Sequence, residues 1–331
     1  MSGVKRLRKI QLGKETTAGT AVPATTIWRG VGTIEDLSEV KSANENIGIL
    51  PDTDRPYIPM NLARLALEET EATFEQLILL FAMGIKNVVS GTADGAGSGK
   101  IWTFPVATIA QETVKTFTFE GGDDQQAEEF AYGFVEEFTI SGAPKQALMM
   151  SASVLGRQVS PSTFTAALTP PTVEEILFGK GSLAIDLIGG TMGATVKANT
   201  LLGFKLNHKT GFQPVWAANG YTYFPYIKQV EPVTTLEVTF EHDATSVAEK
   251  VAMLAKISRQ LQLQFVGEAL TTPAGETVKR LTLPMAGHWE KITKLDEIDG
   301  NDVLTGTFKA GYNATAAKYF TPVVVNEVAS I

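Results

Sequence analysis

The sequence predicts a mainly β, α+β protein that contains the same unit twice. Short segments rich in Val, Thr and Phe are separated by Gly, Pro, Asn or Asp, which is the pattern of strands joined by turns. Only two segments have the apolar spacing of helices. The order of elements around one of these segments is repeated around the other, which indicates a tandem duplication.

Nine strands and two helices can be placed along the chain. The predicted strands are 62–67, 115–119, 134–140, 148–154, 201–206, 236–240, 261–265, 278–283 and 303–308. The predicted helices are 72–84 and 244–260. Both carry apolar residues at i, i+3, i+4 and i+7, and acidic residues precede both, as a helix N-terminus favours.

The segments that flank the two helices resemble each other. RPYIPMNLARLALEETEAT precedes the first helix at 55–73, and FPYIKQVEPVTTLEVTFEHDAT precedes the second at 224–245. The distance from PYI to AT differs by three residues. A predicted hairpin follows each helix, at 132–157 and at 286–311. We place the boundary in the Ser-, Thr- and Pro-rich segment 160–175, which divides the chain into domains 1–168 and 169–331.

Length and composition exclude several classes of protein. The 331 residues exceed the usual size of one domain, which is roughly 100 to 200 residues. A net charge of −8 argues against a surface that grips nucleic acid, although contact with DNA without gripping it remains compatible. The chain has no cysteine, which excludes disulfides and thiolate chemistry. No apolar run approaches the roughly 20 residues of a membrane span, so synthesis in the cytoplasm and no membrane partner are expected.

The motifs that could carry chemistry are incomplete. GAGSGK at 95–100 is not a phosphate loop, because Asp94 and Ile101 stand where Gly and Ser or Thr are needed. The acidic turn 296–302 lacks the closing Glu of a calcium loop, and nothing apolar surrounds the acidic loop 123–129 to raise a pKa. The histidines lack metal-ligand spacing; they are His208, His242 and His288. No catalytic, cofactor-binding or metal-binding residue is assigned, and neither an enzyme nor a cofactor is expected.

Four stretches resemble the tail tube proteins, or major tail proteins, of long-tailed bacteriophages of the siphovirus type. They are GKETTAGTAVPATTIW at 13–28, FEGGDDQQAEEFAYGFVEEFTISG at 119–142, LMMSASVLGRQV at 148–159 and VEEILFGKGSLAID at 173–186. The resemblance implies a tail-tube fold, in which each unit is a β-sandwich or partly closed barrel with one flanking helix. Copies of such a unit pack into rings, and the rings stack into a hollow tube through which DNA enters the host.

The resemblance also implies a location and partners. We expect the protein in the virion tail, in contact with other copies of itself, the tape measure protein, the tail terminator and tip proteins, and viral DNA that passes without specific binding. Two units per chain predict that three chains build a pseudo-hexameric ring. The long doubled chain favours a non-contractile tail, whose tube alone bears mechanical load.

Three segments receive roles from this interpretation. Residues 12–30 have no apolar period, so we expect an arm that becomes ordered on a neighbouring ring, and removal of residues 1–27 is expected to leave both cores folded. The alternative is a frayed terminus without a role. The long connection 41–59 is also expected to reach the next ring. Glu136 and Glu290, which occupy matched places in the two halves, are expected on a predominantly acidic inner wall.

A second function stays open from the sequence alone. A tandem β-sandwich could be a binding module for carbohydrate or protein on a virion or cell surface. The aromatic cluster of Trp216, Tyr221, Tyr223 and Tyr226 would be its binding platform, although alternating aromatic residues in a hairpin more often serve strand packing. Electron microscopy separates the two functions, because tubes or rings support the first and compact monomers support the second.

Overall fold

Strands make up most of the regular structure in the computed structural model, which describes residues 3–51, 53–293 and 295–331. The strands of the first half are β1 Lys9–Lys14, β2 Thr26–Trp28, β3 Gly32–Asp36, β4 Lys41–Ser42, β5 Pro56–Tyr57, β6 Ala63–Glu71, β7 Thr92–Ala93, β8 Lys100–Thr103, β9 Phe117–Gly122, β10 Ala127–Gly142, β11 Met149–Gly156 and β12 Ser160–Ser162. Those of the second half are β13 Gly181–Leu187, β14 Val196–Lys197, β15 Leu201–Lys209, β16 Phe212–Val215, β17 Tyr226–Gln229, β18 Val233–Glu241, β19 Arg259–Ala269, β20 Val278–Ile292, β21 Asp296–Ile298, β22 Asn301–Ala310 and β23 Val323–Asn326. The helices are α1 Leu77–Gly84 and α2 Ala244–Leu254, with short 3-10 turns at Lys5–Leu7 and Phe178–Lys180.

Six strands of each half pair in the same spatial order. In the first half the order is β1, β9, β10, β11, β6, β3. In the second half it is β13, β19, β20, β22, β18, β15. The chain visits both sets in the same sequence, and each helix lies between the strands that correspond, β6 and β9 in one half and β18 and β19 in the other. The two halves therefore share one topology.

The register of the hairpins also agrees. Phe134 lies opposite Leu155 in the first half, and His288 lies opposite Lys309 in the second. In each hairpin one more pair follows, and then the register shifts by one residue. The shift leaves Glu136 in the first half and Glu290 in the second half as the bulged residues. A bulge leaves one residue of a strand without an opposite partner and increases the local twist. The match between these two glutamates, inferred above from the sequence, recurs in the geometry.

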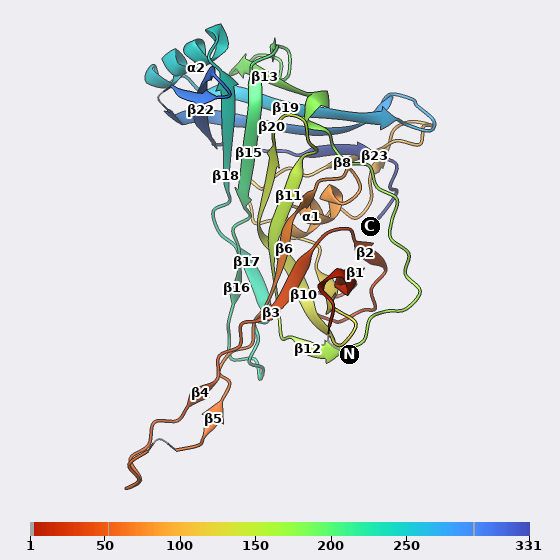
Figure 1. Ribbon diagram of the computed structural model, residues 1–331, viewed down its shortest axis with the longest axis vertical. Helices are drawn as coiled ribbons and strands as arrows, with labels where there is room; N and C mark the ends of the chain where they lie inside the picture. Colours follow the sequence, from red (N-terminus) through yellow and green to blue (C-terminus); the bar gives the residue numbers. More distant parts are fainter. Residues whose placement is uncertain (1–2, 52, 294) are drawn as a thin grey trace.

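The two halves join through β10, which is 16 residues long. Its second part, from Glu137 to Gly142, pairs with β15 of the second half, antiparallel to Phe204–Lys209. The result is one sheet of eight strands in the order β3, β6, β11, β10, β15, β18, β22, β20 (Figure 1). Within the described residues the pairings branch but never return to their starting strand, so the sheet is open.

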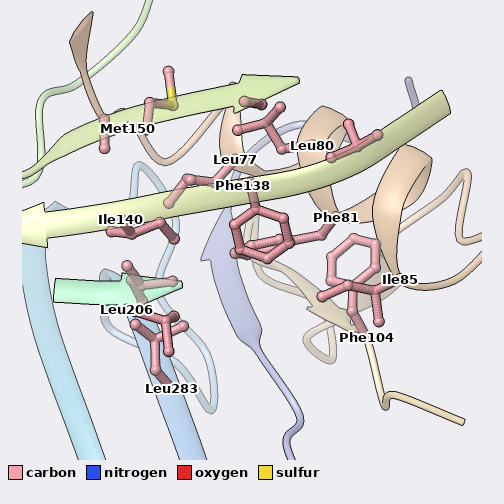
Figure 2. Close-up of a cluster of buried hydrophobic side chains, with 14 of the residues drawn as sticks. Leu77, Leu80, Phe81, Ile85, Phe104, Phe138, Ile140, Met150, Leu206 and Leu283 are labelled. Carbon is pink, nitrogen blue, oxygen red and sulfur yellow. The ribbon is translucent and has the colours of Figure 1, made fainter. Parts of the chain in front are cut away.

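One buried apolar cluster extends through both halves on one face of this sheet. All eight residues of α1 are buried, and Phe81 packs against Phe104 and Phe138, with 5.5 Å between ring centroids in each pair. Figure 2 shows these rings together with Leu206 and Leu283, which come from the second half. A buried helix of this kind has no polar side, which is why its sequence is apolar all round.

Both helices are shorter than the predicted segments 72–84 and 244–260. Residues 72–74 pair with other parts of the chain instead, because Ala72 donates its N–H to the carbonyl of Leu148 and Thr73 forms a bridge with Glu175. Residues 74–76 form a turn before the helix. At the other helix, Arg259 and Gln260 belong to β19, and the left-handed Lys256 ends the helical turn before them. Pairing with distant strands thus overrides the local apolar period at the start of α1 and at the end of α2.

The orientation of α2 differs from the amphipathic expectation. Its buried side carries Ser246, Glu249 and Ala252, whereas Val247 and Val251 are exposed. Glu249 is held by Arg259, at 3.0 Å, and by the indole N–H of Trp289, at 2.9 Å. The ion pair of Glu249 with Arg259, together with the hydrogen bond from Trp289, keeps this side of α2 buried. No helix in the described parts of the chain is long and apolar enough to cross a membrane.

Candidate assembly surfaces

The N-terminal segment is part of the protein's own fold and is not a free arm. β1 pairs with β9 along its whole length and with β2, and Ile10, Leu12, Ala24 and Trp28 are buried. The segment has too few apolar residues to show a period, but the two that alternate in β1 are enough to place one face of the strand in the core. The expectation of an arm at residues 12–30 is therefore wrong for this fold, and so is the alternative of a frayed terminus.

Two buried carboxylates, those of Glu15 and Glu120, accept hydrogen bonds from the N-terminal segment, which has no apolar period. Glu15 is fully buried and accepts hydrogen bonds from the backbone N–H of Gly19 and of Tyr132, at 2.6 and 2.7 Å, and from the hydroxyls of Thr116 and Thr118, at 2.7 and 3.1 Å. Tyr132 has a left-handed backbone conformation, with φ of 64°, and this turns its N–H toward the carboxylate.

Glu120 has the same function for the residues that follow. It accepts from the N–H of Ala24, at 3.2 Å, and from both the N–H and the hydroxyl of Thr165, at 2.7 and 2.6 Å. The carboxylate thus ties the N-terminal segment to the connection between the two halves. Polar anchors of this kind replace the apolar burial that the composition lacks, which is why sequence patterns did not reveal them.

The connection 37–62 contains the hairpin β4–β5, which extends away from the rest of the molecule in Figure 1. Its pairing is limited to Lys41 with Tyr57 and Ser42 with Pro56, while an ion pair joins Arg55 to Glu45. The side chains of Ile47, Ile49 and Leu50 are exposed near the tip. An apolar tip on an extended hairpin leaves apolar surface in water unless another molecule covers it.

The face of the eight-stranded sheet opposite the core is rich in hydroxyl groups. The register places on it Thr33, Thr139, Ser141, Ser151, Ser153, Thr235, Thr239, Thr305 and Thr307. Each of these alternates with a core residue of the same strand, as Thr139 does with Phe138 and Ile140. The hydroxyl residues come from both halves, so this face is continuous across the chain. We call it the hydroxyl face.

The charges on the hydroxyl face are mixed. They are Glu35, Arg64, Glu68, Glu69, Glu71, Glu136, Glu137, Lys205, Lys209, Glu237, Glu290, Lys291 and Lys309. Most cations have a carboxylate close by, since Glu136 lies 3.8 Å from Arg64, Glu290 lies 3.5 Å from Lys309, and cross-strand register places Glu137 opposite Lys209 and Glu237 opposite Lys205. This face carries both expected glutamates, Glu136 and Glu290, and its acidic residues outnumber its cations.

The remaining sequence candidates have structural roles. The loop 95–100 packs on the turn at 272–276, and Asp94 accepts the N–H of Glu276. The pKa of Asp123 is lowered, because the backbone N–H groups of Gln125 and Gln126 bind its carboxylate, and a lowered pKa is the opposite of what a general acid needs. The acidic turn 296–302 forms the hairpin β21–β22. No group of three metal-ligand side chains is found in the ranges that the structure describes.

Packing accounts for His208 and for part of the aromatic cluster. His208 is buried between Phe138 and Phe320, and burial lowers its pKa to about 3. In the hairpin β16–β17, the ring of Trp216 packs edge-on against the buried Phe224, with centroids 6.1 Å apart, and Tyr223 lies over the guanidinium of Arg157. Trp216, Tyr221 and Tyr226 are nevertheless exposed.

The fold and its surfaces are those of a structural protein: two units of like topology, an open sheet and a projecting apolar hairpin, with the chemical motifs absorbed into packing. A comparison with protein families agrees, because the profile described as phage tail tube protein matches residues 6–316. The chain belongs to the phage tail tube protein family, and its role is that of a structural component of the virion tail. A search among curated proteins found no match.

Proposed function

We propose that the protein assembles into rings that stack into the hollow tail tube, and that DNA passes through this tube during ejection. The observation that carries the proposal is the junction of β10 with β15. This junction joins two units of the same topology edge to edge, so one chain already contains the lateral contact that a ring of such units needs. Tandem duplication, with the boundary near residue 168, is part of the proposal and is supported by the repeated strand order and by the matched bulges.

The duplication favours three chains per ring. Each chain supplies two units, so a ring with pseudo-sixfold symmetry needs three chains. We assign the hydroxyl face to the bore, because a polar wall with paired charges offers passing DNA few sites that would hold it. The projecting hairpin β4–β5 takes the role of contact with the next ring, which the N-terminal segment cannot fill. A non-contractile, siphovirus-type tail, the tape measure protein and the terminator and tip proteins complete the proposal.

Electron microscopy of the purified protein tests this function. Tubes or rings with three chains per layer are expected, whereas six chains per ring, or compact monomers at every concentration, would contradict the proposal. A variant in which residues 44–54 are replaced by a short Gly-Ser turn should still form rings but should not stack them, since only the exposed hairpin tip is removed. Monomers would instead favour a binding module, although Trp216 and Tyr223 of its aromatic cluster pack in part against their own chain.

A further inference from the structure

The junction inside one chain is defined by three sets of contacts. Thr139 lies opposite Asn207 where β10 and β15 pair. Beyond β15, Thr210 donates its N–H and its hydroxyl to the carbonyl of the bulged Glu136, at 3.0 and 2.9 Å. The hairpin β16–β17 then covers an apolar surface of the first half, and we call its contact the hairpin seat.

The hairpin seat is an apolar cluster of five side chains. Phe212 and Phe224 from the hairpin region pack against Tyr132, Phe134 and Leu155 of the first half. The ring centroids of Phe224 and Tyr132 lie 5.2 Å apart, and those of Phe224 and Phe134 lie 6.1 Å apart. Arg157 closes the contact by donating to the carbonyls of Phe224 and Pro225, at 3.0 and 2.7 Å. The hairpin of the second half is thereby fixed on the first half.

The strands that correspond to β15 and to the end of β10 lie at the two outer edges of the eight-stranded sheet. Among the described residues, no other strand pairs with these edges. β3, which corresponds to β15, pairs only with β6 among the described residues. The end of β20, which corresponds to the end of β10, has β22 on one side, and none of the described strands lies on its other side beyond Trp289. Glu35, Asp36 and Lys291 are exposed at these two edges. One chain thus ends in two different open edges, and the internal junction shows how such edges join.

A groove occupies the position that corresponds to the hairpin seat. Its volume is about 310 Å³, and its walls include His288, Lys309, Gly311, Tyr312 and Tyr319. His288 and Lys309 stand where Phe134 and Leu155 stand in the first half, because both pairs lie directly before the bulge of their hairpin. In the first half the hairpin β16–β17 covers this site, whereas in the second half the site is open.

The hairpin that corresponds to β16–β17 is β4–β5, and its base is uncovered. The connection between β3 and β6 is slightly longer than the one between β15 and β18, and both contain a short two-stranded hairpin. Val40, at the position of Phe212, is 67% exposed, and Tyr57 and Ile58 are also exposed. An uncovered apolar base and an uncovered groove are therefore present on one chain, at opposite ends of its sheet.

We propose that β3 of one copy pairs with the end of β20 of the next copy, and that the base of its β4–β5 hairpin covers the groove. Transfer of the internal register places Glu35 opposite Thr293 and Asp36 opposite Ile292. The charges are complementary, because Glu35 and Asp36 meet an edge that carries Lys291. Ser38, at the position of Thr210, donates to the carbonyl of Glu290. This contact rests on the proposed ring and specifies its surfaces.

The absence of cysteine allows a direct test by cross-linking. The double variant Glu35→Cys/Thr293→Cys should form disulfides between copies on oxidation of assembled protein, giving denatured species of two and three chains and none larger. The matched control is Thr139→Cys/Asn207→Cys, which should cross-link within one chain, since these side chains face each other at 3.4 Å in the internal junction. Thr33→Cys/Thr293→Cys is two residues out of register, beyond the reach of a disulfide, and should stay reduced.

A second variant tests the groove. Val40→Asp should leave the fold intact, because the side chain is exposed in the single chain, and should raise the concentration needed for ring formation about tenfold. Val196→Asp, at a valine that is 57% exposed on β14, should not raise it. Tubes that form while only the internal control cross-links would overturn the edge contact and leave the proposed function standing. Failure of the unmodified protein to assemble would contradict the proposed function itself, and the contact with it.

Discussion

At the residue scale, the fold depends on buried carboxylates that satisfy backbone donors. Glu15 contacts β9 and β10 as well as its own segment, so one side chain connects three parts of the first half. A buried carboxylate is stable only when hydrogen bonds replace its hydration, and here four donors do so. The sequence around residue 15 gives no sign of this, because the donors lie about 100 or more residues away along the chain for three of the four bonds.

Replacement of Glu15 should destabilise the protein strongly. Glu15→Ala leaves buried donors without an acceptor and should lower the free energy of unfolding by about 3 kcal/mol or more. Glu15→Gln keeps one acceptor oxygen and should cost less. Urea unfolding at neutral pH measures both, with Glu128→Ala as control, because Glu128 is not buried. If Glu15→Ala unfolded at the same urea concentration as the unmodified chain, the anchoring role would be wrong.

His208 should make stability depend on pH. Its pKa is about 3 in the folded protein, because burial disfavours the charged ring, whereas an unfolded chain has a value near 6.5. The unfolded state therefore binds a proton first as pH falls, so this contribution to stability is complete above about 6.5 and decreases between about 6.5 and 3.

His208→Leu should remove that part of the pH dependence. Its hydrogen bond to Thr234, at 2.8 Å, is lost as well, which lowers stability equally at each pH. The informative quantity is thus the difference in unfolding free energy between pH 7 and pH 4.5. It should be smaller in His208→Leu than in the unmodified protein, and it should stay unchanged in His288→Leu, since His288 is exposed. Equal differences in all three proteins would exclude this role for His208.

At the element scale, alternation of apolar and polar residues located the long strands. Segments such as 236–240 and 261–265 fall inside β18 and β19, because one face of each strand enters the core and the other does not. The same criterion missed β1, which has two apolar side chains, and β3, which has one; both receive the rest of their order from pairing. The helix ends were misplaced because backbone pairing with distant strands competes with the local period.

Two truncations separate the terminal turn from β1. Removal of residues 1–8 should leave the fold intact, since Lys5–Leu7 is an exposed 3-10 turn. Removal of residues 1–14 also deletes β1, uncovers one edge of β9 and takes Ile10 and Leu12 from the core, so the protein should lose several kcal/mol of stability or fail to fold. Thermal unfolding followed by circular dichroism distinguishes the two. If the protein without residues 1–14 unfolded cooperatively at the temperature of the unmodified protein, the N-terminal segment would be an arm that folding does not need.

At the scale of the whole molecule, the repeated order of elements was visible in the sequence, but the way the halves join was not. The PYI segments fall at the corresponding strands β5 and β17, and the AT segments lie just before α1 and at the start of α2. The junction of β10 with β15 is made by backbone pairing, and the side chains of a strand do not specify which other strand it pairs with. For the same reason the sequence indicated Glu136 and Glu290 but could not show their partners. Net charge alone could not show how the hydroxyl face is charged, because cross-strand register pairs its lysines with carboxylates although acids are in excess there.

The paired charges of the hydroxyl face lead to a prediction about DNA in the assembled tube. Lys205 and Lys209 lie opposite Glu237 and Glu137, so their attraction for phosphate is largely compensated as long as those carboxylates are present. The variant Glu137→Gln/Glu237→Gln should therefore retain short double-stranded DNA when tubes are sedimented at low salt. The retained fraction should fall steeply above about 0.1 M salt, where the screening length is about 10 Å.

The opposite substitution is the matched control for this effect. Lys205→Gln/Lys209→Gln leaves the carboxylates uncompensated and should retain no more DNA than unmodified tubes at any salt concentration. All four residues lie at paired positions of the neighbouring strands β10, β15 and β18, so a general loosening of the wall would act alike in both variants, whereas charge acts with opposite sign. Equal retention by both variants would therefore mean that paired charge on this face does not govern the passage of DNA. Stronger retention by the lysine variant would mean the same, and would remove this face as the wall of the bore.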